Sequence, residues 1–407
     1  MRIKCISFEN EYANFSVNDI NHFAGIAAGV CYMPNDFYDL ASESDQKCIK
    51  RALNCIKNGH HSVFDHVHVS LVLEDVPKIL CMVLNNEKVY TTSEKSARYT
   101  IMKNLNNKDK YLYEKWTMIL SNIISQKYPD FDKKTIEKKA LENSRYFIGI
   151  FTNCSTMLHT ISIRQLNYEI YMMEQYIENN KNANELSFEY HLSRVFKEFL
   201  ENVAIYKIDG LIPVRKDREL SLFNYPTDIK EEFGINYSTT YKASFSCLAQ
   251  LQRHRKIAYS IKLDKYPRFY IPNIIKGITT FEYQKNFNHQ ITTNPQVTTL
   301  TDLWIQDMNS MKFNYPQGML VNINESGSMD DFIDKLYERN CCQAQLETTR
   351  NCNQVFYRYL ESLKLTMQNS LHDKLAKYEG PRCKFDGFDK CNSRCLFGRN
   401  NYKSREI

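Results

Sequence analysis

The residues best suited to chemistry lie in one short basic run, Arg253-His254-Arg255, with Gln250 just before it. Guanidinium groups stay charged and present several N–H donors in a planar fork, so they suit phosphate, carboxylate or the polar edge of a ring. Apolar residues at helical spacing from Phe245 to Leu251 precede the run, and Ser244 is a suitable N-cap. The run therefore stands at the end of a short amphipathic helix, where either an anion site or a solvated helix end is expected.

The composition of the 407-residue chain is that of a globular protein, with 43% hydrophobic and 25% charged residues, and the length suits two or three domains. The formal net charge of +6 is modest, which favours an enzyme for anionic small molecules over a nucleic-acid-binding protein. The start, MRIKCISFENEY, lacks the apolar region of a signal peptide, and no apolar run is long enough to span a membrane. We therefore expect a cytoplasmic protein with no membrane or nucleic-acid partner.

Cysteine and histidine residues leave the question of metal binding open at two places. The 13 cysteines are odd in number and scattered, which indicates reduced thiols. Near the C-terminus, Cys383, Cys391 and Cys395 fit packed thiols best, although a disulfide or a zinc site with a fourth ligand is also compatible with them. A second group of histidines lacks matched carboxylate or cysteine spacing, so no metal is predicted there. These histidines are His60, His61, His66 and His68.

The elements expected to position the basic run alternate between strands and helices. In the first half we expect a strand over 67–73, a polar loop over 85–99 and helices over 44–59, 78–84, 110–127, 134–146, 156–177 and 189–203. The segment 206–218 carries Gly210, Pro213 and a charge run, which indicates a domain boundary.

After this boundary the order of elements recurs. An alternating segment, YSTTYKAS, leads to a short helix, a polar loop and then helices over 316–345 and 351–375. The order indicates a repeat of roughly 200 residues. We predict an α+β fold with one repeat over 1–208, a second over 209–380 and a cysteine-rich tail over 381–407.

The run QLQRHR, followed by FYIP, resembles the signature of the flavin-dependent thymidylate synthases. GHHSVFDH resembles the family's flavin-binding segment, and SEKSARY resembles the end of its signature. The resemblance covers most of the chain and implies two tandem copies of the family's fold, an antiparallel sheet with long helices packed against it. It assigns the following residues to the flavin: His60, Ser62, Asp65, Arg164, Arg253, His254 and Arg255. It assigns these to the nucleotide: Glu94, Ser96, Ala97, Arg98, Arg145, Gln250, Arg253 and Arg339.

Each half lacks family residues that the other half keeps. The first half has Asn86-Glu87-Lys88 in place of Arg-His-Arg, and Met173 in place of the last substrate arginine. Ser162 replaces the asparagine of the family's Asn-x-Arg flavin contact. The second half has Leu263 in place of the signature serine and Asp330 in place of the flavin-contacting arginine. The complementary losses indicate one composite site per chain, with the nucleotide loop from the first repeat and Arg-His-Arg from the second.

The resemblance implies that dUMP is converted to dTMP, with a carbon from methylenetetrahydrofolate and reducing power from NADPH through FAD. Arg98 and Arg145, with the Ser96 hydroxyl, would bind the phosphate. Arg253 at the pyrimidine edge would stabilise the negative charge that develops there, which makes it the catalytic candidate. No cysteine nucleophile is needed. The family's four-unit assembly would be rebuilt by a homodimer of this chain as a pseudo-tetramer.

Two other functions are compatible with the same residues. The shortened loop after Arg255 favours a related reaction, hydroxymethylation of a pyrimidine nucleotide. Ser162, Met173 and Leu263 favour a non-catalytic paralogue that binds a flavin or a nucleotide.

Overall fold

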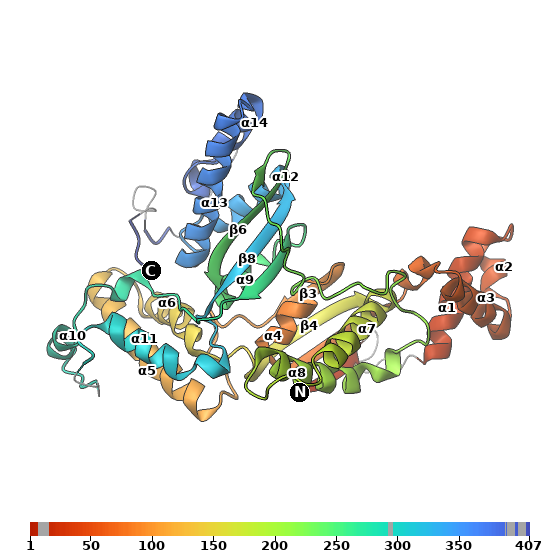
Figure 1. The fold of residues 1–407 in the computed structure, drawn as a ribbon, viewed down its shortest axis with the longest axis horizontal. Helices are drawn as coiled ribbons and strands as arrows, with labels where there is room; N and C mark the ends of the chain where they lie inside the picture. Colours follow the sequence, from red (N-terminus) through yellow and green to blue (C-terminus); the bar gives the residue numbers. More distant parts are fainter. Residues whose placement is uncertain (7–15, 292–295, 387, 389–394, 398–403) are drawn as a thin grey trace. The chain divides into compact units, whose positions relative to one another are not determined.

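The computed structural model describes residues 1–6, 16–291, 296–386, 388, 395–397 and 404–407. These residues form two compact units (Figure 1). The first unit consists of Met1–Lys95 and Asn153–Leu220, and the second consists of Ser96–Thr152 and Ser221–Ile407. The segment 96–152, from the first half of the sequence, thus belongs to the second unit. The predicted repeat boundaries at 208 and 380 remain a prediction, since they concern the order of elements along the chain.

The first unit contains a four-stranded antiparallel sheet in the order β1-β2-β4-β3. The strands are β1 (Arg2–Ile6), β2 (His68–Pro77), β3 (Tyr90–Glu94) and β4 (Asn153–Ser162). The alternation predicted for the segment 67–73 is confirmed, since Val69, Leu71 and Leu73 of β2 are buried. The helices of this unit are α1 (Val17–Tyr32), α2 (Phe37–Ala41), α3 (Asp45–Lys57), α4 (Lys78–Leu84), α7 (Ile163–Asn179) and α8 (Phe188–Val203).

The second unit contains a sheet of the same topology, in the order β5-β6-β8-β7. Its strands are β5 (Glu232–Phe233), β6 (Asn236–Ser244), β7 (Ala258–Leu263) and β8 (Leu320–Ser328). In both sheets a short helix follows the second strand directly, and a longer helix follows the last: α9 (Phe245–Leu251) corresponds to α4, and α12 (Met329–Arg339) to α7. The predicted α+β class with two copies of an antiparallel sheet is confirmed. Two further helices, α13 (Leu346–Leu365) and α14 (Asn369–Ala376), follow.

The core of the second unit is built from two equivalent connections, one between β3 and β4 and one between β7 and β8. The first carries α5 (Asn107–Lys127) and α6 (Lys133–Ser144), and the second carries α10 (Thr280–Phe287) and α11 (Leu300–Ser310). Trp116 of α5 and Trp304 of α11 pack edge to face with ring centroids 4.7 Å apart, both fully buried. Segments from the two halves of the sequence therefore share one hydrophobic core.

Several predicted elements are wrong. The segments 156–177 and 316–345, predicted as helices, begin instead with the strands β4 and β8. The helices start only after Ser162 and Ser328, whose hydroxyls cap them by accepting hydrogen bonds from Gln165 N at 3.2 Å and Asp331 N at 3.1 Å. The loop predicted over 85–99 contains β3, and the helix predicted over 351–375 is the pair α13 and α14.

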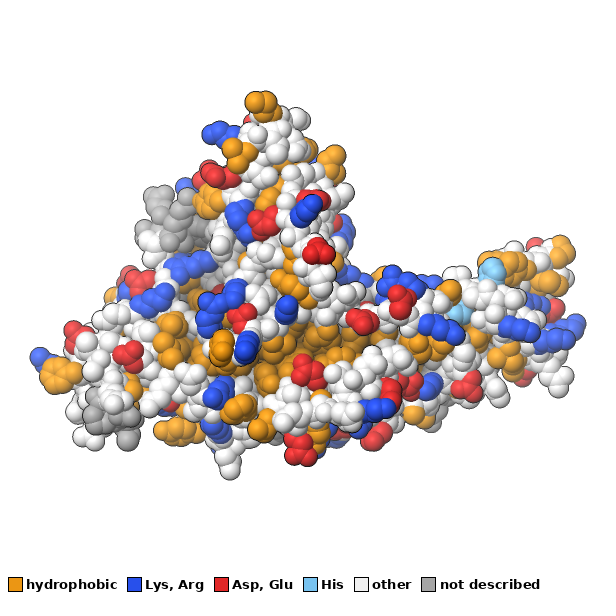
Figure 2. Space-filling model, in the orientation of Figure 1, with side chains coloured by type: hydrophobic (Ala, Val, Ile, Leu, Met, Phe, Trp, Pro, Cys, Tyr) orange, Lys and Arg blue, Asp and Glu red, His pale blue; other side chains and the backbone are white. Residues whose placement is uncertain are grey.

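Within the described residues, no helix is long and apolar enough to cross a membrane. Basic and acidic side chains are both scattered over the face of the molecule shown in Figure 2.

Candidate active site

The loop SEKSARY brings Arg98 into the second unit through a tight turn. Tyr99 N and Thr100 N donate to Ser96 O at 3.1 and 3.2 Å, and Ser96 Oγ accepts from Arg98 N at 3.4 Å. Ala97 lies in this turn and is half-buried. The Arg98 guanidinium donates to Glu142 from Nε at 2.8 Å and to Gln343 O from Nη2 at 2.5 Å. The orientation of Arg98 is therefore fixed by a carboxylate from the first half of the sequence and a carbonyl from the second.

The carboxylate of Glu142 is shared between two cations. Besides the ion pair with Arg98 at 2.7 Å, it lies 3.4 Å from Lys139 Nζ, one helical turn away on α6. Burial alone would raise the pKa of Glu142, but the charges of Arg98, Lys139 and Arg145 lower it to about 2. Burial lowers the pKa of Lys139, which is 4% exposed. One buried carboxylate thus neutralises only part of the surrounding positive charge.

Arg145, directly after α6, is a buried cation without a carboxylate partner among the described residues. It is 6% exposed and donates from Nη2 to Gln345 Oε1, while its Nε has no hydrogen-bond partner. Burial, together with the charge of Arg98, lowers the pKa of Arg145. An uncompensated buried charge is costly, so this arrangement favours the binding of an anion.

A buried chain of hydrogen bonds connects Arg145 to the helix α9. The amide of Gln345 donates to Tyr146 OH, which in turn donates to Glu347 Oε2 at 2.7 Å. Glu347 also accepts from Ser244 N at 2.8 Å and Ser244 Oγ at 2.6 Å, and Ser244 is the N-cap of α9. Gln250, near the end of α9, donates to Gln345 Oε1. Gln345 therefore holds Arg145 and Gln250 through the same oxygen.

The basic run at the end of α9 divides into an inward and an outward part. Arg339, the last residue of α12, donates from Nε to His254 Nε2 at 2.9 Å and from Nη2 to Gln250 O at 2.9 Å. Burial and the charges of Arg339 and Lys335 lower the pKa of His254 to about 2, so the imidazole is neutral and accepts this bond. Arg253 and Arg255 are exposed, and Arg253 makes no side-chain hydrogen bond or ion pair in the part of the chain that the structure describes.

The residues that the resemblance assigns to the flavin in the first repeat form a group within the first unit. Asp65 and Arg164 form an ion pair at 2.7 Å, and Ser162 Oγ donates to Asp65 at 2.9 Å. The Nε of Arg164 has no hydrogen-bond partner. His60 and Ser62 are exposed. The Ser62 hydroxyl is therefore accessible to a ligand, whereas the unbonded Nε of Arg164 is buried.

Glu94, predicted to contact the nucleotide, lies in the first unit and is held by another partner. Its carboxylate accepts from Lys78 Nζ at 2.5 Å. The other residues predicted for the nucleotide all lie in the second unit: Ser96, Ala97, Arg98, Arg145, Gln250, Arg253 and Arg339.

Sequence reasoning missed Glu142, Gln345 and Glu347. Glu142 lies three residues before Arg145, at a spacing that places both on one helical face, and this signal was readable. Gln345 and Glu347 gave no signal, since their partners lie about 100 to 200 residues away in the sequence.

The cysteine tail is described only in part, and Cys391 lies outside the described residues. Cys383 and Cys395 form no disulfide within the part described. No group of three or more histidine, cysteine or acidic side chains placed to hold a metal occurs among the described residues.

Comparisons with known proteins found similarity to part of the chain. Residues 16–208 match the family model described as "Thymidylate synthase complementing protein". A flavin-dependent thymidylate synthase from Clostridium tetani is 26% identical over 166 residues, a match that covers 34% of this chain and 64% of the relative's length. Residues 16–208, a little under half of the chain, are thus similar to the flavin-dependent thymidylate synthase family, and the match spans less than two thirds of the relative's length.

A solved structure is also similar to part of the chain. The crystal structure of the flavin-dependent thymidylate synthase ThyX from Helicobacter pylori, complexed with FAD and dUMP, aligns with 52% of this chain and 100% of its own, at 14% identity and a TM-score of 0.30. Similarity at this level is too low for the roles of individual residues to be transferred.

Proposed function

We propose that this chain is a flavin-dependent thymidylate synthase that converts dUMP to dTMP with one composite site per chain. The observation that supports this most is the hydrogen-bonded group in the second unit. There Arg145, from the first half of the sequence, and Gln250, from the second half, both bind Gln345 Oε1. Arg98 is anchored beside them through Gln343 O. Two incomplete repeats thus supply one complete set of cationic side chains.

The phosphate of dUMP is the anion proposed for the buried cations. Arg145 has no carboxylate partner among the described residues, and its Nε is unbonded, so a phosphate oxygen would satisfy both its charge and its free donor. Ser96 contributes a hydroxyl at the same turn as Arg98. The unbonded Oε1 of Gln250, which is buried, is an acceptor for an N–H of the pyrimidine or a hydroxyl of the sugar.

The reduction requires stabilisation of negative charge on the pyrimidine. Arg253 has no side-chain partner in the described chain, which leaves its whole guanidinium for the O2 and N1 edge of the ring. Arg339, oriented by His254 and Gln250 O, is proposed for the other edge. Both cations would stabilise the negative charge that develops on the pyrimidine ring and would hold the ring in position.

FAD, when bound, supplies the hydride chemistry, with NADPH and methylenetetrahydrofolate as co-substrates. The donor set suits such a group, because Ser62 is exposed and the Arg164 side chain is 35% exposed in the first unit. Arg253 and Arg255, which are exposed in the second unit, are proposed as further flavin contacts, as the resemblance implies. We also propose that two chains associate, as the family's four-unit assembly implies.

A second candidate is a hydroxymethylase or a non-catalytic flavin- or nucleotide-binding paralogue. The observation that favours it is Leu263, which pairs with Val321 at the end of β7 and offers no hydroxyl where the signature has a serine.

The experiment uses the purified full-length chain. Flavin absorbance, dUMP-dependent oxidation of NADPH and chromatographic detection of dTMP are measured together. The proposal expects all three, and their joint absence would refute it, whereas NADPH oxidation without dTMP would favour the hydroxymethylase.

The composite site has its own test. Arg253→Ala should abolish dTMP formation, and the neighbouring exposed Lys256→Ala serves as the matched control, which should retain it. An active Arg253→Ala variant would contradict the proposed site.

A further inference from the structure

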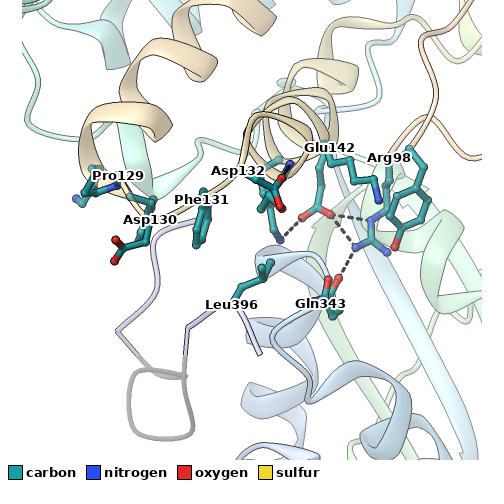
Figure 3. Close-up of a pocket in the computed structure, with 14 residues that line it drawn as sticks. Arg98, Pro129, Asp130, Phe131, Asp132, Glu142, Gln343 and Leu396 are labelled. Atoms are coloured by element: carbon teal, nitrogen blue, oxygen red, sulfur yellow. Dashed lines mark hydrogen bonds and ion pairs between the residues drawn. The ribbon is translucent and has the colours of Figure 1, made fainter. Parts of the chain in front are cut away.

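A cavity of about 610 Å³ opens beside Arg98 within the second unit (Figure 3). One face of α6 lines it, since Thr135, Lys138, Lys139 and Glu142 recur at helical spacing. The turn between α5 and α6, Pro129–Asp132, lines it at the start of α6, and Gln343 and Leu396 also contribute to the lining (Figure 3). This volume lies in the usual range of small-molecule sites.

Four cationic side chains and three carboxylates line the cavity, which leaves a small excess of positive charge: Arg98, Lys127, Lys138 and Lys139 against Asp130, Asp132 and Glu142. Glu142 is shared by Arg98 and Lys139, so two buried or half-buried cations face one carboxylate. Lys139 has only a 3.4 Å contact to that carboxylate. Lys138 lies 5.5 Å from the ring centre of Tyr99 and forms no ion pair among the described residues. An ammonium that is poorly compensated inside a cavity attracts an anionic group.

Aromatic side chains stand beside these lysines. Tyr128 and Phe131 stack with centroids 4.9 Å apart and an interplanar angle of 11°. Both line the cavity, as does Tyr99, whose ring also lies under the Arg98 guanidinium at 5.1 Å. Such rings offer surfaces for a planar ligand.

We propose that this cavity is a second binding site, for a phosphorylated ligand that carries a planar ring, such as a nucleotide. The lysines would bind the phosphate as point charges, since the fork of Arg98 is already used by Glu142 and Gln343. The cavity is not the proposed substrate site, because its lining lacks Arg145, Gln250, Arg253 and Arg339.

The two sites share Arg98, and this makes them interdependent. A phosphate bound to Lys139 competes with Glu142 for that lysine. Glu142 is the carboxylate that orients Arg98 among the described residues, so its position would change. Occupancy of the cavity therefore alters the affinity of the substrate site, and the reverse holds by linkage.

The test is calorimetric titration of the full-length protein with ATP, dTTP and inorganic phosphate as probes. We expect at least one nucleotide to bind, with an affinity at least tenfold above that of inorganic phosphate. Lys138→Gln should weaken this binding about tenfold, as loss of a charge-assisted contact does. Lys134→Gln is the matched control, since Lys134 is an exposed lysine of the same helix outside the cavity lining.

Several results would overturn the proposal. They are no binding by any probe, equal binding of inorganic phosphate and the nucleotides, or equal losses in Lys138→Gln and Lys134→Gln. Abolition of binding by Arg253→Ala would place the ligand in the substrate site instead. Because these measurements do not require turnover, they remain informative even if the chain makes no dTMP.

Discussion

Replacing Arg145 by methionine should affect stability and ligand binding in opposite directions. The guanidinium is 6% exposed, has no carboxylate partner among the described residues, and has its pKa lowered by burial. Methionine removes this uncompensated charge while keeping a similar length. The lost hydrogen bond to Gln345 costs about 1 kcal/mol. We therefore expect the ligand-free variant to be as stable as the native protein, to within about 1 kcal/mol, or more stable.

Binding of dUMP should fall sharply in the same variant. Removing one partner of a buried charged pair typically costs about 2 to 5 kcal/mol, which raises Kd roughly 30-fold to 4,000-fold. The assay is thermal unfolding with and without saturating dUMP, supported by calorimetric titration. A ligand that binds only the folded state raises the native Tm, and this shift should disappear in Arg145→Met.

Arg268→Met is the matched control, because Arg268 is an exposed arginine of the second unit whose side chain is 60% exposed. It should retain the dUMP-dependent shift. The reasoning is refuted if Arg145→Met lowers the Tm of the ligand-free protein by many degrees and keeps the shift with dUMP. Arg145 would then be a structural residue.

The remaining predictions concern stability in the second unit. Because the folded pKa of Glu142 is about 2, below the ordinary 4.5, its carboxylate stabilises the fold above pH 4.5, and this stabilisation is lost as the pH falls towards 2. Glu142→Gln should thus be roughly 3 kcal/mol less stable at pH 7, and the difference from the native protein should shrink in urea unfolding at lower pH. Trp304→Ala should cost about 3 to 5 kcal/mol in the same assay, since its ring is fully buried against Trp116 and Phe147. A pH-independent difference for Glu142→Gln, or a loss under about 1 kcal/mol for Trp304→Ala, would contradict these predictions.

The elements predicted correctly from the sequence are those in which buried residues are apolar and recur at the spacing of a strand or a helix. The strand β2 alternates apolar and polar residues, and the short helix α4, predicted over the same residues, is buried from Ile79 to Leu84. The strands β4 and β8 were missed because their buried positions include polar residues. Glu325 in β8 is fully buried and is satisfied by Tyr237 and Tyr241 from β6 and by Lys335 from α12. Partners distant in sequence made a polar residue suitable for the core, so alternation of hydrophobicity gave no sign of the strand.

The same limit applies to the candidate site. Resemblance to the family predicted Arg98 and Gln250 through its signature, and Arg145 through a separate helical segment. Gln345 and Glu347 act on other protein groups, and the bonds that they make cross long stretches of sequence. Such supporting residues can be recognised only from their contacts in the folded protein, and a single sequence does not show those contacts.

The shared core of the second unit offers a physical basis for the proposed composite site. The connection from the first repeat and the connection from the second meet where Gly149 pairs with Pro316, and a Cβ on Gly149 would lie 2.8 Å from Asn314 O. This close approach aligns Tyr146 with the second repeat, since Gly318 N donates to Tyr146 O at 2.9 Å. Arg145 and Gln345 are thereby positioned by backbone contacts as well as by their own hydrogen bond. Because both repeats are anchored in one core, a mutation that removes an arginine at another position of either repeat leaves Arg98, Arg145 and Gln250 in place. We infer that each repeat could lose different family residues for that reason.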